Sequence, residues 1–591
     1  MSSRQVDRAT WTNVARSIGF LISEAFRTAP VQTSAAVLST LLLAGYPAVQ
    51  MLAVAYTAER VEAGQPGAGE TLIFVAAVII VAAPLSSTGT YFRSVVSTKL
   101  VARWQVRILR HNDDVKSSEL ASESNYRGNE ERSRSINEVV SHQFNLFLSG
   151  VLEQVGALVS VLVVLASFSW VAAVLIAVAV VPFLVGGLYL SSRQTSMWKR
   201  LGKYYARERY VRDLALFPSS AHELRIFGAS RWVIGRYTDI WRSISTERLR
   251  YSTRNLVVDL IVALTTSVPV ILALAAATLA SDSAATAVAA IYGVLAAVRA
   301  VSAAGVAYGT FLQGIEPTNS LRQYLRATAA TRTEASAGRP EHYRSVPTMD
   351  ICVSDLTVQY DSADRPALSA VSLSVRTGEL VALVGENGAG KTTLIRALLG
   401  VVPYEAGEIT MNARVIGAGR KEPSARLFGV VQQEATRPEF TVREAVALGA
   451  GVGDDQIWSA LDKARALEFV GRLPRGLDQP LGTRWGGAGL SGGEWQRLAL
   501  ARLFLSDRQV WLLDEPTSAV DAFTEEEIFE AIRTHASTRA VIVTTHRAWT
   551  LQSADRIYVF RGGRIVQEGK YDELSSTEGE FRRLFKKQLS G

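Results

Sequence analysis

The chain has 591 residues, a single cysteine and a formal net charge of +8 at neutral pH. This length exceeds the size at which one hydrophobic core stops growing, so two or more domains are expected. A single cysteine excludes an intrachain disulfide and a thiolate metal cluster. The basic residues of the first half lie between apolar runs rather than on one compact face, which favours membrane topology over nucleic-acid binding.

The first 29 residues are polar and contain several arginines. A secretory signal begins its apolar stretch sooner and ends at a small-residue cleavage site, so this segment is expected to be retained. Within it, the stretch "WTNVARSIGFLISEAF" alternates apolar and charged residues at helical spacing. The pattern predicts an interfacial helix lying on a membrane, with a solvated leader as the alternative.

Six apolar segments follow, and each is long enough to cross a bilayer, which takes about 20 residues of helix. They span residues 31–56, 71–92, 147–168, 170–190, 256–280 and 284–312. The rest of the chain alternates short apolar runs, Gly-rich turns and charged segments. The predicted fold is therefore an all-α transmembrane domain of six long helices, residues 1–330, followed by an α/β domain, residues 349–591. Gly338 and Pro340 are expected to end the sixth helix within a linker at 331–348.

The loops between the apolar segments differ in charge. "TAERVEAGQPGAGE" after the first segment is net acidic, whereas the long segments 93–145 and 191–254 are rich in Lys and Arg. The positive-inside rule places the long segments, both termini and the second domain in the cytoplasm. Arg is much commoner than Lys, and Ala and Val are abundant, as in a GC-rich bacterial gene. The expected location is thus a bacterial inner membrane.

The two long basic segments have helical periodicity and few helix breakers, so they are predicted to be helices that continue out of the bilayer. Each needs a turn at its tip. "SESNYRG", residues 122–128, and "FPSSAHELRIFG", residues 217–228, are the candidates, and Pro and Gly bracket a short helix in the second.

Three ionisable residues lie in or beside the apolar segments: Glu153, Asp259 and Arg299. Charges in membrane spans are costly and therefore suggest function. Glu153 and Asp259 lie near the predicted cytoplasmic ends, where a capping or water-exposed role is equally compatible with the sequence. Arg299 lies deeper, so we expect it to face a cavity and to pair with a carboxylate or an anionic substrate group.

The second domain contains "LVALVGENGAGKTTLIRALLG", in which an apolar strand precedes Gly385 and a helix follows Lys391. This is the context that a phosphate-binding P-loop requires. Its glycines allow backbone N–H groups to close around phosphates, and the helix N-terminus adds a favourable dipole. Lys391 is expected to hold the β- and γ-phosphates, and the Thr392 hydroxyl to bind Mg²⁺.

Two further predicted strands end in side chains that could bind Mg²⁺, activate a water molecule or contact a phosphate. "RQVWLLDEP" predicts a buried strand that ends in adjacent carboxylates, Asp514 and Glu515, whose side chains point in different directions. Asp514 is expected to bind Mg²⁺ through water and Glu515 to activate an attacking water as general base. "AVIVTTH" ends at His546, which is expected to contact the γ-phosphate. Cys352 lies in an apparent strand and is expected to be a small core residue.

These motifs, together with "LSGGEWQR" at residues 490–497, resemble the ATP-binding cassette (ABC) transporters, specifically exporter-type half-transporters with six spans and one nucleotide-binding domain. The resemblance covers essentially the whole chain. It implies that Tyr360 stacks on adenine, that Gln433 senses Mg²⁺ and that Asp521 connects the two nucleotide sites of a dimer. It also implies two binding segments. The P-loop segment is Gly385, Glu386, Asn387, Gly388, Ala389, Gly390, Lys391, Thr392 and Thr393, and the signature segment is Leu490, Ser491, Gly492, Gly493 and Glu494.

The resemblance implies that the signature segment grips the γ-phosphate held by the P-loop of another subunit. The partner is expected to be a second copy of the chain or a related half-transporter, and ATP and Mg²⁺ the bound groups. The expected function is ATP-driven export of an amphipathic small molecule or peptide. The alternatives are a lipid flippase or a siderophore-type importer of the same architecture, and more distantly an ABC ATPase that transports nothing. Membrane lipid and the transported substrate are the other expected partners, and nucleic acid is not expected.

Overall fold

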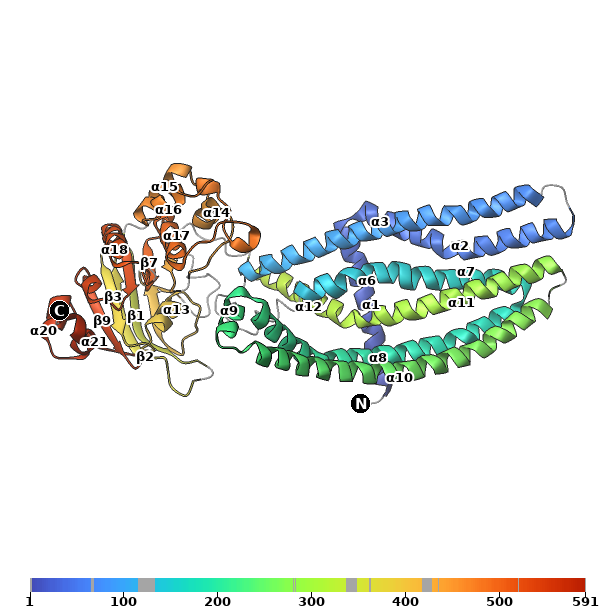
Figure 1. Cartoon of the computed structure of the whole chain (residues 1–591), viewed down its shortest axis with the longest axis horizontal. Helices are drawn as coiled ribbons and strands as arrows, with labels where there is room; N and C mark the ends of the chain where they lie inside the picture. The colour runs from blue at the N-terminus through green and yellow to red at the C-terminus, as the bar shows by residue number, and fades with distance from the viewer. Residues whose placement is uncertain are drawn as a thin grey trace. The chain divides into compact units, whose positions relative to one another are not determined.

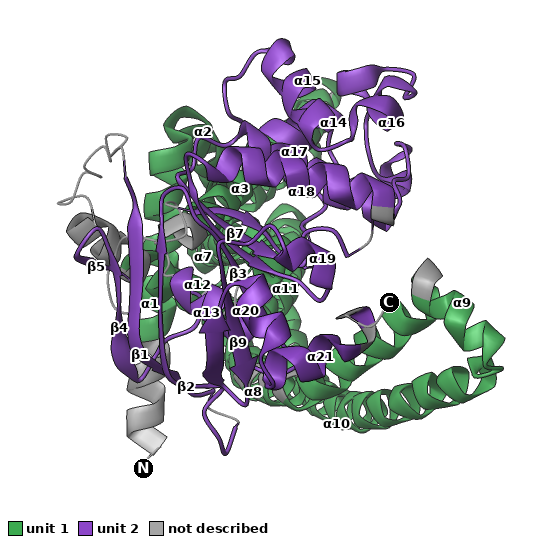
Figure 2. Cartoon of the chain, turned by 90° about the vertical axis from the view of Figure 1, so that its left-hand side faces the viewer, with its two compact units in different colours: residues 1–111, 128–331 green, residues 112–127, 332–591 purple. Residues whose placement is uncertain are grey.

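The computed structural model describes residues 3–64, 68–114, 133–279, 281, 283–335, 348–360, 363–416, 428–433, 435–518 and 520–589. Backbone contacts divide the chain into two compact units, drawn along the chain in Figure 1 and in separate colours in Figure 2. Unit 1 comprises Met1–His111 and Gly128–Thr331, and unit 2 comprises Asn112–Arg127 and Arg332–Gly591.

All the elements in the described residues of unit 1 are helices, and six helical segments are long and apolar enough to cross a membrane. This confirms the predicted six-helix domain. The six segments lie in α2 (Pro30–Glu62), in α3 (Ala68–Asp114), in the segment Ser133–Phe168 that ends with α7 (Glu153–Phe168), and in α8 (Trp170–Leu216), α10 (Ser230–Leu279) and α11 (Ala284–Gln313). Short helical segments lead into α7: η1 (Ile136–Val140), α6 (Ser141–Asn145) and η2 (Leu146–Leu152).

The N-terminal helix α1 (Ser3–Thr28) precedes these spans. One face of it is buried, with Leu21 and Ala25 fully enclosed, and the Phe20 ring stacks on the Trp104 ring at a centroid distance of 5.9 Å. Burial of one face fits the amphipathic pattern of its sequence. An interfacial position on the membrane remains a prediction.

Side-chain caps explain where two of the long helices begin. The Ser169 hydroxyl accepts a hydrogen bond from the Ala172 N–H at 3.3 Å at the start of α8. At the start of α11, Ser283 and Thr286 form a reciprocal capping box. The Glu62 carboxylate adds two acceptors, for the N–H groups of Ala284 and Ala285 at 3.2 and 3.0 Å. These contacts satisfy first-turn N–H groups that have no partner within the helix.

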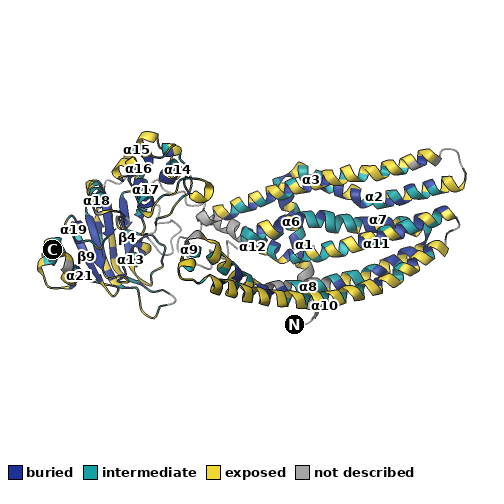
Figure 3. Ribbon diagram, viewed as in Figure 1, coloured by how far each residue is buried: buried dark blue, intermediate teal, exposed yellow. Residues whose placement is uncertain are grey.

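Many large apolar side chains of unit 1 are exposed along its helices, which Figure 3 shows as long outer stretches of yellow. Ile73, Val163 and Leu264 are each about two-thirds exposed, whereas Met51, Val161 and Val294 are enclosed between helices. On helices of membrane length, lipid is the natural cover for such a surface.

The helices α3, α8 and α10 extend well beyond their apolar windows, as predicted for helices that continue out of a bilayer. Between α8 and α10 lies the short helix α9 (Pro218–Ile226), which confirms the helix predicted between Pro and Gly. The other predicted tip, residues 122–128, lies outside the described residues.

The sixth helix is shorter than expected. It ends at Gln313, and a separate helix, α12 (Ile315–Ala335), follows after Gly314. Pro317 provides the physical reason, because it has no N–H with which to continue the helical hydrogen bonds across this point. Most of the predicted linker 331–348, including Gly338 and Pro340, lies outside the described residues.

Unit 2 contains two β-sheets. The larger sheet has the strand order β10-β9-β3-β8-β7-β6, and all its neighbouring pairs are parallel except β9 and β10. Its strands are β3 (Leu380–Gly385), β6 (Phe428–Val431), β7 (Val510–Asp514), β8 (Ala540–Thr544), β9 (Arg556–Arg561) and β10 (Arg564–Gly569). The smaller, antiparallel sheet has the order β2-β1-β4-β5, with β1 (Asp350–Val358), β2 (Leu368–Arg376), β4 (Ala406–Met411) and β5 (Arg414–Ile416).

Every residue of β3, β7 and β8 is buried, because apolar clusters cover both faces of the larger sheet. In β7, Trp511 and Leu513 pack in one cluster, and Val510 and Leu512 pack in the other. This explains the continuous apolar run in the sequence of that strand. The helices of unit 2 are α13 (Lys391–Leu398), α14 (Val442–Ala447), α15 (Asp454–Lys463), α16 (Leu467–Gly471), α17 (Gly492–Leu505), α18 (Ala522–Ala536), α19 (Ala548–Leu551), α20 (Tyr571–Ser576) and α21 (Glu580–Leu589).

The expectation that Cys352 is a core residue is wrong. Cys352 lies in β1 as predicted, but its side chain is exposed. Its neighbours Ile351 and Val353 are both buried. Because side chains alternate along a strand, burial of these two larger residues places the cysteine on the opposite face.

Candidate functional site

The P-loop follows β3 and leads into α13, so it joins a central strand to a helix N-terminus. Gly390, the residue before α13, has a φ of +107°, and Gly385 has a φ of +153°. A Cβ atom at Gly385 would lie 2.4 Å from the Phe560 carbonyl oxygen, and one at Gly390 would lie 2.7 Å from the Leu368 side chain. Only glycine fits these two positions, and the turn they allow brings backbone N–H groups to the start of the helix.

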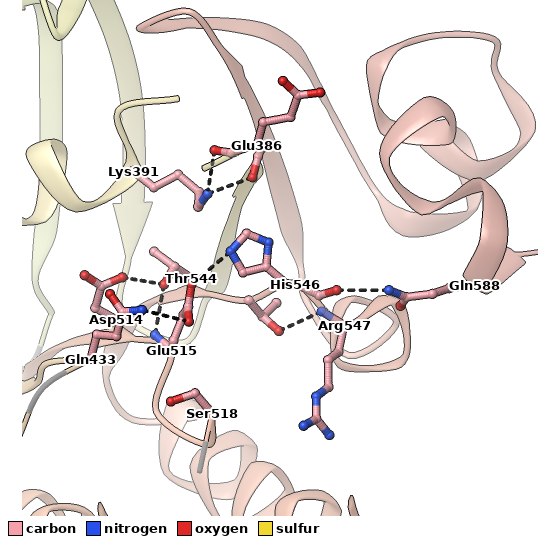
Figure 4. A network of polar contacts seen from close by, with 12 residues as sticks. Glu386, Lys391, Gln433, Asp514, Glu515, Ser518, Thr544, His546, Arg547 and Gln588 are labelled. Atoms are coloured by element: carbon pink, nitrogen blue, oxygen red, sulfur yellow. Dashed lines mark hydrogen bonds and ion pairs between the residues drawn. The ribbon is translucent and has the colours of Figure 1, made fainter. Parts of the chain in front are cut away.

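The side chain of Lys391 folds back over the same loop. Its Nζ donates hydrogen bonds to the carbonyl oxygens of Gly385 at 2.7 Å and Glu386 at 3.1 Å (Figure 4). Burial lowers the pKa of the Lys391 ammonium, and the nearby carboxylates of Glu515 and Asp514 oppose that shift. A cation held against backbone carbonyls at a helix N-terminus is well placed to bind phosphate oxygens.

Strands β3, β8 and β7 are adjacent and parallel, so their carboxyl ends meet at one edge of the sheet. They place the P-loop, Thr544 and Asp514 side by side. The Thr544 hydroxyl donates to Asp514 Oδ1 at 2.7 Å and accepts from the Glu515 N–H at 3.0 Å. One threonine of β8 therefore orients both acidic residues at the end of β7.

Glu515 is the first residue after β7 and has a φ of +50°. A non-glycine residue in this conformation costs about 1–3 kcal/mol and persists only where surrounding contacts impose it. Besides Thr544, the buried Gln496 supplies such a contact, because its Nε2 donates to the Glu515 carbonyl oxygen at 3.0 Å. The positive φ of Glu515 sets the direction in which its side chain leaves the end of β7. The predicted divergence of the Asp514 and Glu515 side chains stays a prediction.

The carboxylate of Glu515 lies between two polar partners (Figure 4). His546 Nε2 is 2.9 Å from Oε1, and Gln433 Nε2 donates to Oε2 at 3.4 Å. Gln433 follows β6 and His546 follows β8, so these residues approach from strands on both sides of β7. A carboxylate in this position can accept a proton from an attacking water, while the histidine fixes its orientation.

The signature segment caps α17. The Ser491 hydroxyl accepts from the Glu494 N–H at 3.3 Å, and the Glu494 carboxylate accepts from the Ser491 N–H at 2.7 Å. Gly492 lines a cavity of about 460 Å³ together with Gln433, Gln496 and Ser518. The P-loop residues Gly385, Glu386 and Asn387 line a different cavity, of about 230 Å³.

Tyr360 lies beside the helix that follows the P-loop, and Asp521 lies at the start of α18. The Tyr360 hydroxyl is 3.5 Å from the Thr393 hydroxyl, which places the aromatic side chain beside the P-loop helix. Asp521 caps α18 by accepting from the Thr524 N–H at 3.0 Å, and this backbone hydrogen bond lowers the pKa of Asp521. Neither contact tests the roles that the resemblance implies for these residues.

Mg²⁺ is compatible with the donor chemistry at this edge of the sheet. Thr392 offers a hydroxyl, Gln433 an amide oxygen and Asp514 a carboxylate, and hard oxygen ligands are what Mg²⁺ prefers. Within the residues that the structure describes, no three His, Cys, Asp or Glu side chains form a metal cluster. A few protein ligands supplemented by substrate phosphates and water is the usual arrangement for Mg²⁺ at such sites.

Three residues of this site were not predicted from the sequence. Thr544 could have been found as a polar residue at the end of a buried strand, in line with Asp514. Gln496 lies within the signature motif, but its link to the Glu515 carbonyl depends on how α17 packs. Gln588 contacts the segment after His546 and lies near the end of the chain, where no sequence pattern indicates a link to the site.

Unit 1 contains its own polar cluster. Arg93 is almost fully buried, and its Nη1 lies 3.6 Å from Glu153 Oε2. The same guanidinium donates to the hydroxyls of Thr90 at 3.0 Å and Thr40 at 3.4 Å. Glu153 is thus the partly buried ion-pair partner of a buried arginine, with 18% of its side chain exposed. Asp259 and Arg299 are exposed on α10 and α11.

Comparisons with known proteins agree with this site. Residues 368–518 match the ABC transporter family. The chain is 36% identical over 244 residues to an ATP-dependent lipid A-core flippase of Idiomarina loihiensis, a match that covers 41% of this chain and 42% of that protein. A flippase of the same description from Methylobacillus flagellatus is 35% identical over 241 residues, or 40% and 41% of the two chains. The matches thus span about two fifths of the length of these relatives.

A solved structure described as a bacterial Atm1-family ABC exporter with ATP bound resembles the chain as a whole. Its TM-score is 0.73 at 20% identity, and the alignment covers 95% of this chain and 98% of that one. The fold and the site define an ABC-type ATPase domain on a chain with six membrane-length helices. Residues 368–518 therefore carry a domain of the ABC transporter family, the chain as a whole shares the fold of that exporter, and its six membrane-length helices indicate a multi-pass membrane protein.

Proposed function

We propose that the chain hydrolyses ATP to drive the export of an amphipathic small molecule or peptide. The observation that carries the proposal is the 2.9 Å contact between Glu515 and His546 beside the P-loop lysine, in a chain that also has six membrane-length helices. A general base next to a phosphate-binding loop suits hydrolysis of a nucleoside triphosphate. Because the same chain contains membrane helices, that hydrolysis can drive a conformational change in them.

In the proposed reaction, the P-loop N–H groups and Lys391 hold the β- and γ-phosphates, and Tyr360 stacks on the adenine. Glu515 accepts the proton of the attacking water, and His546 contacts the γ-phosphate while it orients the carboxylate. Thr392, Gln433 and Asp514 would hold Mg²⁺, which would neutralise charge on the phosphates. The strained backbone of Glu515 keeps the base in place before ATP binds.

We propose that the working form is a dimer, with a second copy of the chain as the simplest partner. Gly492 of the signature and Gly385 of the P-loop line separate cavities, which supports a role for the signature at another nucleotide. In the dimer, the partner's Ser491 and the partner's Gly493 would meet the γ-phosphate at the N-terminus of α17. ATP would hold the two nucleotide-binding domains together, and hydrolysis would release them.

The proposed orientation places the ATPase unit, both termini and the basic extensions of the long helices on the cytoplasmic side of a bacterial inner membrane. Arg299 is proposed to face the transport pathway. It is exposed on α11, about two helical turns from the partly buried Tyr292, and both residues lie within a membrane-length helix. A charge in such a position needs water or an anionic partner, so substrates with a carboxylate or phosphate group are favoured.

Lipid flipping is the second candidate function. The specific observation in its favour is that relatives of 35–36% identity are described as ATP-dependent lipid A-core flippases. A lipid with an anionic headgroup would also satisfy Arg299. Export and flipping differ in the substrate and share the ATPase step.

The test is vanadate-sensitive ATPase activity of the purified full chain in lipid nanodiscs, compared with Glu515→Gln across a panel of peptides, drugs and lipids. We expect the substitution to lower the turnover number at least about 100-fold while ATP binding persists, because it removes the base and keeps the shape. Stimulation by a lipid or by a soluble amphiphile would separate the two candidates. A folded wild-type homodimer that binds ATP without hydrolysing it would refute the homodimer proposal.

Arg299→Ala tests the pathway proposal in the same nanodiscs, with Arg299→Lys as the matched variant that keeps the charge. We expect Arg299→Ala to reduce stimulation by anionic substrates and leave the unstimulated ATPase rate unchanged. Equal stimulation of wild type and Arg299→Ala would remove this residue from the pathway.

A further inference from the structure

The C-terminal helix α21 (Glu580–Leu589) is anchored firmly to the ATPase unit. Phe581 and Phe585 are buried in the core cluster of the larger sheet, and their rings contact each other at a centroid distance of 5.0 Å. Two buried aromatic residues one helical turn apart fix the direction of the helix. The polar residues on its other faces therefore have a defined position.

Gln588 extends from α21 to the segment that follows His546. Its Oε1 accepts a hydrogen bond from the Ala548 N–H at 2.7 Å. Its Nε2 donates to the His546 carbonyl oxygen at 3.1 Å, the contact that Figure 4 draws. The two bonds pair a side-chain amide with the backbone on both sides of Arg547. This pairing fixes the backbone conformation in the residue next to the histidine ring.

The Ala548 N–H has a particular need for this partner. Ala548 is buried and is the first residue of α19, so its N–H has no acceptor within the helix. The preceding residue, Arg547, provides no side-chain cap. Gln588, 40 residues away in the sequence, supplies the missing acceptor.

The contact between Gln588 and the His546 backbone is linked to the proposed general base, Glu515, through the His546 side chain. The same His546 whose carbonyl binds Gln588 places its Nε2 at 2.9 Å from Glu515 Oε1. A continuous series of contacts thus runs from Gln588 through His546 to Glu515, and all three side chains are drawn in Figure 4. A change in the backbone at His546 would move the ring that orients the carboxylate.

A second contact places α21 at the P-loop. Leu584 and Phe585 line the cavity of about 230 Å³ that Gly385, Glu386 and His546 also line. Arg583 Nη2 lies 2.7 Å from Glu386 Oε1, although both side chains are more than half exposed and the ion pair adds little stability. The helix therefore contacts the loop that holds the phosphates as well as the segment that holds the histidine.

We propose that Gln588 is a positioning residue for His546 and thereby for the base Glu515. The proposal rests on the proposed ATPase function. Gln588 touches no reacting atom. It holds the backbone on both sides of Arg547 so that the His546 ring stays within hydrogen-bonding distance of Glu515.

The experiment compares three variants of the full chain in nanodiscs: Gln588→Met, Gln588→Glu and Arg582→Ala. The first keeps the length of the side chain and removes both hydrogen bonds. The second keeps the acceptor for the Ala548 N–H and loses the donor to the His546 carbonyl. The third is the matched control, since Arg582 is exposed on the same helix. The readouts are the turnover number and KM for ATP, and hydrogen exchange in peptides that cover residues 546–551.

We expect Gln588→Met to lower the turnover number about 3- to 10-fold with KM changed less than about 2-fold, because misplacing the histidine affects the chemical step more than binding. Exchange at residues 546–551 should rise, since the Ala548 N–H loses its acceptor. Gln588→Glu should fall between wild type and Gln588→Met, and Arg582→Ala should match wild type. In a His546→Ala background, Gln588→Met should cause no further loss, whereas a merely structural contact would lower activity in both backgrounds.

Three results would overturn the proposal. Unchanged exchange in Gln588→Met would show that the contact does not hold this segment. Faster exchange with an unchanged turnover number would leave the contact structural and remove the positioning role. A wild-type chain without ATPase activity would refute the proposed function and the positioning role with it. If only the positioning role is wrong, the wild-type chain will still hydrolyse ATP.

Discussion

Unit 2, the ATPase unit, and unit 1, the membrane unit, both contain ionisable side chains that are largely shielded from solvent. The two units differ in what these side chains contact. In the ATPase unit, Lys391 begins the helix that follows β3, whereas Asp514 and Glu515 lie at the carboxyl end of β7, and the three residues converge on one open edge of the sheet. In the membrane unit, Arg93 and Glu153 come from α3 and α7 and pair with each other. Charges that converge on an open edge are available to a ligand. Charges that pair inside a helical unit neutralise one another and hold helices together.

The largest expected effect breaks the pair in the membrane unit. Arg93→Met leaves the Glu153 carboxylate without its cation, which should lower the free energy of unfolding by about 3–5 kcal/mol. Replacing both residues, in Arg93→Met with Glu153→Gln, should recover most of that loss because no charge is left unpaired. Thermal unfolding of the detergent-solubilised full chain would measure both. Arg299→Met, at an exposed position on α11, is the matched control.

A loss of less than about 1 kcal/mol in the single variant would show that water or lipid headgroups reach Glu153. Glu153 would then be accessible to polar groups from outside the protein, like the side chains at the sheet edge of unit 2. The proposed difference between the two units would be wrong.

The next effect concerns Thr544, whose hydroxyl hydrogen-bonds to both acidic residues at the end of β7. Thr544→Val keeps the shape and removes the hydroxyl that donates to Asp514 and accepts from Glu515. We expect about 1–3 kcal/mol of lost stability and a turnover number about 10-fold lower, because the carboxylates lose their orientation.

Thr544→Ser keeps the hydroxyl and should stay close to wild type in both measurements. Equal behaviour of the valine and serine variants would mean that packing of the methyl group, rather than hydrogen bonding, is what the site requires at this strand end.

The smallest expected effect is pH-dependent and involves His535, a partly buried residue of the ATPase unit whose ring contacts aromatic core residues. Its ring stacks on Trp511 at a centroid distance of 5.5 Å, and burial lowers the pKa of His535 below the ordinary value of 6.5. The unfolded chain therefore binds this proton more readily than the folded chain. The stability that the neutral ring contributes is complete above pH 6.5 and is lost as the pH falls through the lower folded pKa.

Unfolding temperatures of wild type and His535→Phe, compared between about pH 7.5 and pH 5.5, would measure this effect. The wild type should lose more stability on acidification, and because all other histidines are common to both proteins, the difference reports His535. Parallel pH profiles would show that the ring stays accessible to protons in the folded state.

The sequence alone determined the motifs and the membrane segments, since both depend on local rules. A span needs about 20 apolar residues and a P-loop needs glycines at set positions between a strand and a helix, so neither requires knowledge of distant contacts. The order of the motifs predicted that Lys391, Asp514, Glu515 and His546 belong to one site.

Tertiary structure decided which residues support that site. Cys352 was expected in the core because it lies in a strand, but the choice of the inward face depends on which neighbours pack. Thr544, Gln496 and Gln588 come from three separate elements, and only the packing of β8, α17 and α21 brings them to Glu515 and His546. Hydrogen bonds between residues distant in sequence leave no periodicity or spacing in the chain, so their partners become visible only once the sheet and its helices are assembled.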